Sequence, residues 1–483
     1  MKNTYHYCFL VVCLLLSSTA STFSQESTNE PDLSESFRLI DTWLKVQYQY
    51  DQLPGISVAI VKDQEVLFSK GYGWADTEQK VPATSETLYS ICSISKLFTA
   101  VAVMKLRDEG KLSLEDTIED LLPWYDLEQA HENSGPITVR SLLTHSSGLP
   151  RESAHPYWTG PDFPFPNQTE VRRGLRTQET LYPASTYFQY SNLGLTLLGE
   201  IVSEVADMPY DEFVEQNILR PLELKDTYTE LPEDLWGNKL ATGYGAQKRD
   251  GSRDKQKRFE AAGITAAAGY SSSVEDLGKF ASWQFRLLEA GGEEILKAPT
   301  LREMQRVHWM NPDWTTSWGL GFSVYEVDGK TMVGHGGSCP GYRSTLVLDP
   351  SSQYAFIVMI NASGENPSTY ARAMRSIVME GLKGKQKEVP EDGPDLEAYA
   401  GTYDLQPWWG EEVILPWKGQ LVTFGIPSEN PAKGFTKLKH IEGNRFRKVR
   451  KDGTLGEAWE FKVDDRGKVH SYLQHSNVTK KLE

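Results

Sequence analysis

Ser93 and Lys96 are a pair of residues whose types and spacing could perform covalent catalysis. They form a Ser-x-x-Lys motif at the start of a predicted apolar helix over 93–108, and a spacing of three places both side chains on one helical face. Burial and the positive end of the helix dipole both lower the pKa of a lysine, so a neutral Lys96 could activate Ser93 as a nucleophile. The spacing recurs at Ser252 and Lys255, in a charged stretch that we interpret as a solvated loop.

Tyr190 and Asn192 form the only Tyr-x-Asn motif of the chain, just before a second predicted apolar helix over 191–206. A phenol beside a cation can shuttle a proton, and the amide of Asn192 can hold both a lysine and a substrate amide. The alternative is structural: Ser191 or Asn192 caps the helix and Tyr190 packs beside it.

His335 and Gly337 belong to a His-Gly-Gly sequence that ends a predicted apolar strand. Two glycines would let a substrate approach the strand edge. The N–H of the next residue, Ser338, could join that of Ser93 in an oxyanion hole. The alternative is a glycine bulge that carries a surface histidine.

The elements around these motifs predict one α/β unit with an antiparallel sheet over residues 35–382. Helical spacing begins at Phe37, and two apolar runs that read as a hairpin follow it. The predicted strands are 56–61, 66–69, 319–325, 331–335, 344–348 and 354–360, and the remaining predicted helices are 274–288 and 368–382.

The composition changes after this unit. Residues 383–395 are charged, contain prolines and predict a linker. Residues 396–483 show short alternating stretches divided by turn residues, which predicts a small all-β domain. We expect Trp408, Trp409 and Trp417 to fill its interior.

The N-terminus has the features of an export signal. Lys2 precedes an unbroken apolar run over 8–16, and cleavage after Ala20 or Ser24 would fit the small residues that follow. We therefore predict a signal peptide over 1–24, a disordered leader over 25–34 and a periplasmic or extracellular protein. A membrane anchor is the alternative, although nine apolar residues are too few to span a bilayer.

Two cysteines, Cys92 and Cys339, remain after removal of the signal, and each adjoins a motif described above. We expect free buried thiols rather than a bridge.

Composition excludes several classes of protein. A net charge of −16 and a pI near 5.2 argue against nucleic-acid binding, which needs a basic face. The chain contains no His-Glu-x-x-His, no cysteine pair at zinc spacing and no Gly-x-Ser-x-Gly elbow. We expect no metal, no cofactor, no nucleic-acid partner and no membrane span in the mature form, and a small-molecule or short-peptide substrate.

The order of the three motifs resembles that of the serine β-lactamase-like superfamily, nearest its class C β-lactamase, DD-peptidase and family VIII esterase branch. The matching residues are Ser93 and Lys96, Tyr190 and Asn192, and His335 and Gly337, and other similar stretches are 143–149, 269–272 and 334–342. The resemblance implies an antiparallel sheet flanked by helices plus an all-helical subdomain. Residues 396–483 are similar to an appended lipocalin-like domain, which implies a small all-β barrel.

The resemblance also implies acyl-enzyme chemistry. Ser93 would attack a carbonyl carbon, Lys96 and Tyr190 would share the general-base role, and the N–H groups of Ser93 and Ser338 would hold the oxyanion. Which of Lys96 and Tyr190 is the base stays open. The family's third motif often begins with lysine, whereas His335 is mostly neutral at pH 7, which favours peptidase or esterase activity over β-lactam hydrolysis.

These features predict an exported serine hydrolase that cleaves amide or ester bonds. The alternatives are a true β-lactamase and a non-catalytic penicillin-recognising protein of the same fold.

Two neighbouring features also need an explanation. His145, in the 143–149 stretch, is expected to be structural, and the aromatic-rich segment 149–189 either walls the site or forms a rigid surface loop. Trp309, Trp314 and Trp318 are expected to pack rather than to stack on substrate.

Overall fold

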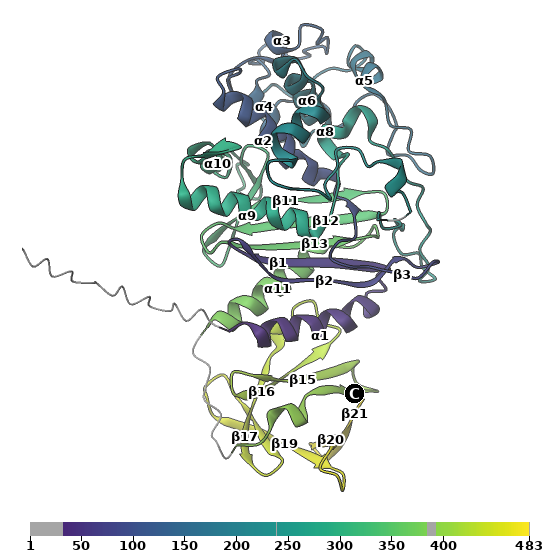
Figure 1. The fold of residues 1–483 in the computed structure, drawn as a ribbon, viewed down its shortest axis with the longest axis vertical. Helices are drawn as coiled ribbons and strands as arrows, with labels where there is room; N and C mark the ends of the chain where they lie inside the picture. The colour runs from purple at the N-terminus through teal and green to yellow at the C-terminus, as the bar shows by residue number, and fades with distance from the viewer. Residues whose placement is uncertain (1–31, 238, 384–392, 483) are drawn as a thin grey trace, which may run out of the picture.

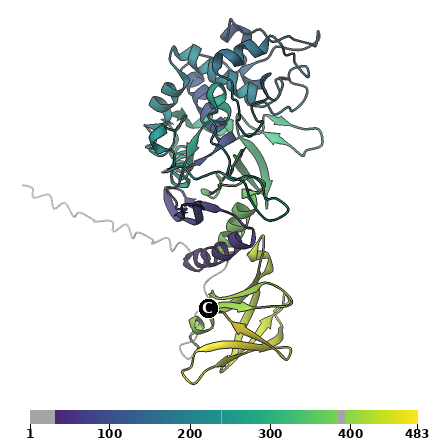
Figure 2. The same ribbon diagram turned by 90° about the vertical axis from the view of Figure 1, so that its right-hand side faces the viewer.

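The computed structural model describes residues 32–237, 239–383 and 393–482. The predicted signal peptide lies outside these residues, as do most of the predicted leader and of the predicted linker. From top to bottom, Figure 1 shows a group of helices, a sheet, two helices beneath the sheet and a barrel, and Figure 2 shows the same order after a quarter turn. Within the described ranges, no helix is long and apolar enough to cross a membrane.

An antiparallel sheet of nine strands forms the centre of the larger part of the chain, in the order β3-β2-β1-β13-β12-β11-β10-β9-β8. Its strands are β1 (Gly55–Lys62), β2 (Glu65–Asp76), β3 (Val81–Pro82), β8 (Trp309–Met310), β9 (Ser317–Trp318), β10 (Ser323–Val327), β11 (Lys330–Cys339), β12 (Tyr342–Asp349) and β13 (Tyr354–Ile360). The predicted strands all overlap this sheet. β2 extends well beyond the predicted 66–69, because its backbone pairs along the whole of β1 even where its residues are glycine or polar.

Helices cover both faces of this sheet. α9 (Val274–Ala290) packs on one face, and α1 (Ser34–Tyr50) and α11 (Pro367–Leu382) lie beneath the other (Figure 1). The helical spacing predicted from Phe37 is confirmed in α1, whose buried face includes Leu39, Trp43 and Leu44. Two further pairs of short strands are β4 (Tyr89–Ser90) with β5 (Ser271–Ser272) and β6 (Glu293–Glu294) with β7 (Leu296–Lys297).

The remaining helices of this part form a subdomain above the sheet, together with α10 at its side (Figure 1). They are α2 (Ser95–Asp108), α3 (Ile118–Leu121), α4 (Val139–Leu143), α5 (Gln168–Leu175), α6 (Asn192–Ala206), α7 (Tyr210–Val214), α8 (Thr265–Ala268) and α10 (Ala298–Met304). α2 and α6 pack together at the centre of this subdomain, and nearly every residue of their apolar stretches is buried. The predicted fold, a helix-flanked antiparallel sheet with a helical subdomain, is confirmed.

The C-terminal part is a closed barrel of eight antiparallel strands, as predicted. They are β14 (Gly401–Asp404), β15 (Glu411–Trp417), β16 (Gln420–Ile426), β17 (Thr436–Glu442), β18 (Arg445–Val449), β19 (Leu455–Val463), β20 (Val469–Gln474) and β21 (Asn477–Lys481). Large side chains such as Phe446, Phe461 and Tyr472 fill the interior.

The prediction that three tryptophans fill the barrel is wrong. Trp408 and Trp409 are 85% and 56% exposed, because both lie in the turn between β14 and β15 rather than on a strand. Trp417 is buried, but on the outer side of the barrel, where it belongs to a core shared with α1 and α11.

The barrel is fixed to the rest of the molecule through these two helices. Its outward apolar side chains, among them Val413 and Phe424, pack in one cluster with Trp43 of α1 and residues of α11. Trp43 Nε1 donates a 2.9 Å hydrogen bond to the carbonyl of Ser428, and the N–H of Ser428 donates to Gln47 Oε1 at 2.8 Å. The barrel is therefore docked by apolar packing and by direct hydrogen bonds.

A disulfide joins Cys92 to Cys339, with their Cα atoms 5.8 Å apart, so the prediction of two free thiols is wrong. The cysteines are 247 residues apart in the chain. Only the folded sheet brings the end of β11 beside the short 3-10 turn Cys92–Ile94 that precedes α2. Proximity of this kind leaves no local pattern in a sequence.

Replacing both cysteines by alanine should lower the free energy of unfolding by about 2–5 kcal/mol, because the bridge restricts a long loop in the unfolded chain. Urea denaturation of oxidised wild-type protein and of the double variant measures this difference. Dithiothreitol should destabilise the wild type and leave the double variant unchanged. Equal stability of the two oxidised proteins would show that the bridge contributes nothing.

Candidate active site

Ser93 lies in the 3-10 turn Cys92–Ile94, which runs directly into α2, rather than in the first turn of the helix itself. The residue before it, Cys92, has φ +54°, a left-handed conformation that is costly for residues other than glycine and asparagine. The turn is held by the disulfide and by the N–H of Ile91, which donates to the Tyr270 carbonyl at 2.8 Å. The nucleophile candidate thus stands on a constrained backbone.

Lys96 is fully buried one helical turn after Ser93. Its Nζ lies 3.1 Å from Ser93 Oγ and donates a 2.6 Å hydrogen bond to the carbonyl of Ala267. Burial holds the Lys96 pKa well below its usual value; the nearby charge of Glu152 raises it and that of Arg151 lowers it. A buried amine with a lowered pKa beside a hydroxyl can act as a base.

The Gly337 position of the third motif packs directly against the segment that carries Ser93. A Cβ there would stand 2.1 Å from the Ile91 carbonyl oxygen and 2.2 Å from Ser344 Oγ, so only glycine fits. Ser344 Oγ also donates to that carbonyl at 3.0 Å. The prediction that both glycines let a substrate approach is wrong for Gly337. Gly337 is buried against the backbone that precedes Ser93, whereas Gly336 is exposed.

Tyr190 and Asn192 stand at the start of α6. Ser191 is the N-cap, and its Oγ accepts a 2.8 Å hydrogen bond from the N–H of Gly194. The capping alternative is therefore true of Ser191, and the same cap places Tyr190 beside the other motifs. The Tyr190 ring centroid lies 5.0 Å from Lys96 Nζ, and its hydroxyl lies 3.5 Å from His335 Nε2.

His145 holds the segment before α6 in place. It is buried, its Nδ1 accepts a 3.1 Å hydrogen bond from the N–H of Ser191, and its carbonyl accepts a 2.7 Å bond from the N–H of Gln189. Its ring also lies 4.2 Å from that of Tyr190, between centroids. Burial, together with the charge of Lys96, holds the His145 pKa well below its usual value, so the ring is neutral. This geometry fits the structural role expected for His145.

His335 presents an unprotonated nitrogen to Tyr190. Its Nδ1 lies 2.6 Å from the carbonyl oxygen of Gly336, which can only accept, so Nδ1 carries the proton and Nε2 carries a lone pair. Burial, reinforced by the charge of Lys96, lowers the His335 pKa to about 3. Burial also raises the pKa of Tyr190. At neutral pH both residues are uncharged, and the phenol can donate a hydrogen bond to the imidazole.

Arg151 and Glu152 are site residues that the motifs did not reveal. Glu152 Oε1 accepts a 2.6 Å hydrogen bond from Asn192 Nδ2, and Arg151 Nε lies 3.3 Å from the same oxygen. The Arg151 guanidinium also lies 4.9 Å from the centroid of the Tyr190 ring. The bond to Glu152 fixes the amide, whose buried Oδ1 has no partner among the described residues. That oxygen can accept a hydrogen bond from a substrate N–H.

Replacing Glu152 with glutamine should move the acid limb of the kcat/KM profile to lower pH. The Glu152 carboxylate raises the pKa of Lys96, so its removal makes the protonated amine less stable and lets Lys96 lose its proton at lower pH. A pH–rate profile of each protein measures the shift. Glu442→Gln, an equal change of charge on the barrel, should leave the limb in place; a shift of the limb to higher pH would contradict this assignment.

Segment 149–189 contributes two residues to the site, and it is not the surface loop of the alternative, because several of its aromatic residues belong to the hydrophobic core. Its first residues bring Arg151 and Glu152 into the site, whereas its aromatic residues Tyr157, Trp158 and Phe165 pack with one another. Trp318 of β9 is buried and completes the wall of the site. Its ring contacts those of His145, Tyr190 and His335.

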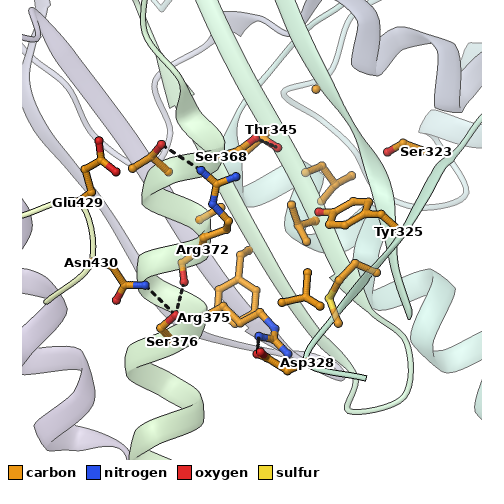
Figure 3. Close-up of a pocket in the computed structure, with 18 of the residues that line it drawn as sticks. Ser323, Tyr325, Asp328, Thr345, Ser368, Arg372, Arg375, Ser376, Glu429 and Asn430 are labelled. Atoms are coloured by element: carbon orange, nitrogen blue, oxygen red, sulfur yellow. Dashed lines mark hydrogen bonds and ion pairs between the residues drawn. The ribbon is translucent and has the colours of Figure 1, made fainter. Parts of the chain in front are cut away.

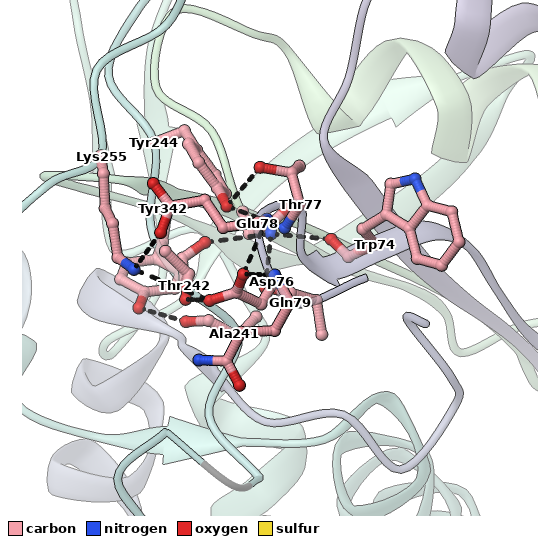
Figure 4. Close-up of polar contacts among 12 residues, drawn as sticks. Trp74, Asp76, Thr77, Glu78, Gln79, Ala241, Thr242, Tyr244, Lys255 and Tyr342 are labelled. Carbon is pink, nitrogen blue, oxygen red and sulfur yellow. Dashed lines mark hydrogen bonds and ion pairs between the residues drawn. The ribbon is translucent and has the colours of Figure 1, made fainter. Parts of the chain in front are cut away.

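The second Ser-x-x-Lys sequence is part of a surface network (Figure 4). Lys255 Nζ lies 3.1 Å from the Glu78 carboxylate and 3.7 Å from that of Asp76. Asp76 in turn accepts hydrogen bonds from two backbone N–H groups of the following turn and a 2.7 Å bond from Thr242 Oγ1. Both Ser252 and Lys255 are exposed, as the sequence predicted, so they provide a matched control for Ser93 and Lys96.

The chain is similar in sequence to a known family and to several other proteins. A family model described as Beta-lactamase matches residues 40–379. Protein flp of Staphylococcus aureus (strain MW2) is 28% identical over 342 residues, which cover 69% of this chain and 64% of that protein. The match thus spans less than two thirds of the staphylococcal protein. Beta-lactamase-like protein 2 of Dictyostelium discoideum is 24% identical over 391 residues, covering 77% of this chain and 68% of that protein.

Solved structures share the fold. The octameric penicillin-binding protein homologue from Pyrococcus abyssi superimposes with a TM-score of 0.63 at 26% identity, covering 92% of this chain and 99% of that one. EstCE1, a hydrolase with promiscuous acyltransferase activity, has a TM-score of 0.60 at 21% identity and covers 72% of this chain and 99% of its own. Since the family model spans most of the chain and includes all three motifs, this protein belongs to the Beta-lactamase family.

Proposed function

We propose that this protein is an exported serine hydrolase, which cleaves amide or ester bonds through an acyl-Ser93 intermediate. The observation that carries the proposal is the contact of a fully buried Lys96 Nζ with Ser93 Oγ at 3.1 Å, with a lysine pKa well below its usual value. A buried amine whose charge is disfavoured and which lies within hydrogen-bond distance of a hydroxyl is placed to take the proton of that hydroxyl.

Lys96 is the general base of this mechanism. Burial raises the pKa of Tyr190 and lowers that of Lys96 well below its usual value, so the amine gives up its proton far more readily than the phenol does. Lys96 takes the proton of Ser93 as Oγ attacks the substrate carbonyl. The Tyr190 hydroxyl then relays the proton to the leaving group, and water hydrolyses the acyl-Ser93 ester by the reverse sequence.

The oxyanion that forms during attack is held by the backbone N–H groups of Ser93 and Ser338. Beyond Gly334, β11 pairs with β12 and no longer with β10, so the strand has one edge without a β10 partner where Ser338 lies. The disulfide and the close packing at Gly337 fix this edge beside the Ser93 turn. An oxyanion donor of this type contributes about 10²–10³ in rate.

The portion of the substrate that faces His335 is uncharged rather than anionic. A His335 with a pKa of about 3 offers no cation at neutral pH to a substrate carboxylate. The guanidinium of Arg151 is already paired with Glu152. Small esters and peptide or D-amino-acid amides are therefore favoured over β-lactams, whose carboxylate would find no cation at His335.

A substrate panel tests this proposal. We expect p-nitrophenyl esters or D- or L-amino-acid anilides to exceed nitrocefin in kcat/KM by at least about tenfold, the effect of one unmatched charged group. Faster turnover of nitrocefin would identify a true β-lactamase instead. Stable acylation by penicillin without turnover of any substrate would identify a non-catalytic penicillin-recognising protein.

Export is supported by the disulfide, since structural disulfides persist mainly in oxidising compartments. Fractionation of cells that produce either the full chain or a chain lacking residues 2–24 tests this part. We expect the full chain in the periplasm or medium and the shortened chain in the cytoplasm. Equal distribution of the two would exclude a signal peptide.

A further inference from the structure

A cavity of about 640 Å³ lies on the far side of the sheet, where the barrel meets the catalytic part (Figure 3). Strands β10–β13 and α11 form most of its wall, and the barrel contributes Glu429, Asn430 and Lys433. A volume of this size can hold a small organic ligand. Neither part of the chain encloses the cavity alone.

Part of the accessible cavity wall is apolar. Tyr325, Val327 and Val347 line it and are at least partly exposed, whereas Met332 and Phe356 are fully buried behind them. A ligand that fills this space would gain free energy by removing an apolar body of its own from water.

The wall of the cavity carries three basic and two acidic side chains. Arg372, Arg375 and Lys433 line it, against the acidic groups Asp328 and Glu429. In Figure 3, Arg375 extends from α11 to Asp328, whereas Arg372 turns back along the helix, where its Nη2 donates to Thr369 Oγ1 at 3.3 Å. Both guanidinium groups lower the pKa of Tyr325, although burial raises it overall.

One N–H donor of the Arg375 guanidinium is unpaired among the described residues. Its side chain is 7% exposed, and its Nη1 donates to Asp328 at 2.8 Å, but its buried Nε has no partner among the described residues. Burying an unpaired donor of a charged group is costly. An anionic acceptor in the cavity would satisfy this donor.

We propose that this cavity is a second ligand site, specific for a small amphiphilic carboxylate. The carboxylate accepts hydrogen bonds from Arg375 and Arg372 and interacts with the charge of Lys433, and the apolar chain lies against Tyr325 and Val347. Since His335 also lines the cavity, the site adjoins the catalytic strand β11. The barrel then has a definite role, because it supplies Asn430 and Lys433 to the site. This inference does not depend on the proposed hydrolase activity.

Isothermal titration calorimetry on the full chain carrying Ser93→Ala tests the site, because turnover cannot contribute to the signal. We expect octanoate to bind saturably at one site, and octan-1-ol and octylamine to bind at least about tenfold more weakly. Arg372→Glu and Lys433→Glu should each weaken octanoate binding by about tenfold or more. Lys439→Glu, an exposed barrel lysine outside the cavity, should leave it unchanged.

Both substitutions lie at exposed positions, so circular dichroism should show folded variants. If one of them fails to fold, the other decides the question. The proposal is overturned if octanoate shows no saturable binding, if octanol binds equally well, or if a folded Arg372→Glu or Lys433→Glu protein retains the wild-type affinity.

Discussion

Replacing Ser93 with alanine is expected to lower kcat by about 10⁴-fold or more on any ester or amide that the wild type cleaves. The hydroxyl oxygen of Ser93 forms the covalent bond to the substrate, and it lies 3.1 Å from Nζ of Lys96, which takes its proton. Substrate binding should change little, because the other side chains of the site stay in place. Steady-state kinetics and a separate measurement of inhibitor affinity distinguish the two effects.

The second Ser-x-x-Lys sequence gives the control for this variant. Ser252 is exposed and donates its hydroxyl to Asp250 at 2.7 Å, away from the three motifs. Ser252→Ala should therefore keep wild-type kcat. If Ser93→Ala retained more than a few per cent of activity while Ser252→Ala lost it, the nucleophile would have been assigned to the wrong motif.

Replacing Lys96 with methionine should lower kcat by about 10²–10⁴-fold, the contribution of a general base. Methionine has nearly the same length, so the buried space stays filled. The carbonyl of Ala267 loses the donor that lies 2.6 Å away, which makes a modest loss of stability the only expected structural effect. The acid limb of the remaining activity should also disappear, because the group that titrates there is gone.

A control variant and a stability measurement show whether the loss of activity comes from the missing base. Lys255→Met, at the exposed decoy position, should change neither kcat nor the pH profile. Thermal melting of Lys96→Met shows whether the loss of activity reflects unfolding. A folded Lys96→Met protein with near wild-type activity would assign the base role to Tyr190, the alternative that the sequence left open.

Local patterns were sufficient wherever an element depends on its own residues. The apolar run of α6 behind a serine cap predicted the helix, and the helical spacing from Phe37 predicted α1. The family resemblance implied that the three motifs form one site, and the structure brings Ser93, Lys96, Tyr190 and His335 together. The length of β2 was missed because backbone pairing with β1 does not need apolar side chains.

Contacts between distant segments could not be predicted in the same way. The disulfide joins residues 247 apart, and Tyr190 meets His335 across 145 residues, so both depend on the folded sheet. Glu152 lies in a segment without periodicity, and only its position just after the 143–149 stretch could have drawn attention to it. The two exposed tryptophans of the β14–β15 turn were misassigned because large aromatic residues are usually buried.

Intact-mass measurement after reaction with a fluorophosphonate probe tests the central claim most directly. A mechanism with a Lys96-activated Ser93 predicts one stoichiometric adduct, which peptide mapping locates at Ser93, and predicts no adduct on the Ser93→Ala variant. No gain in mass on the folded wild type, or equal labelling of the Ser93→Ala variant, would contradict the account.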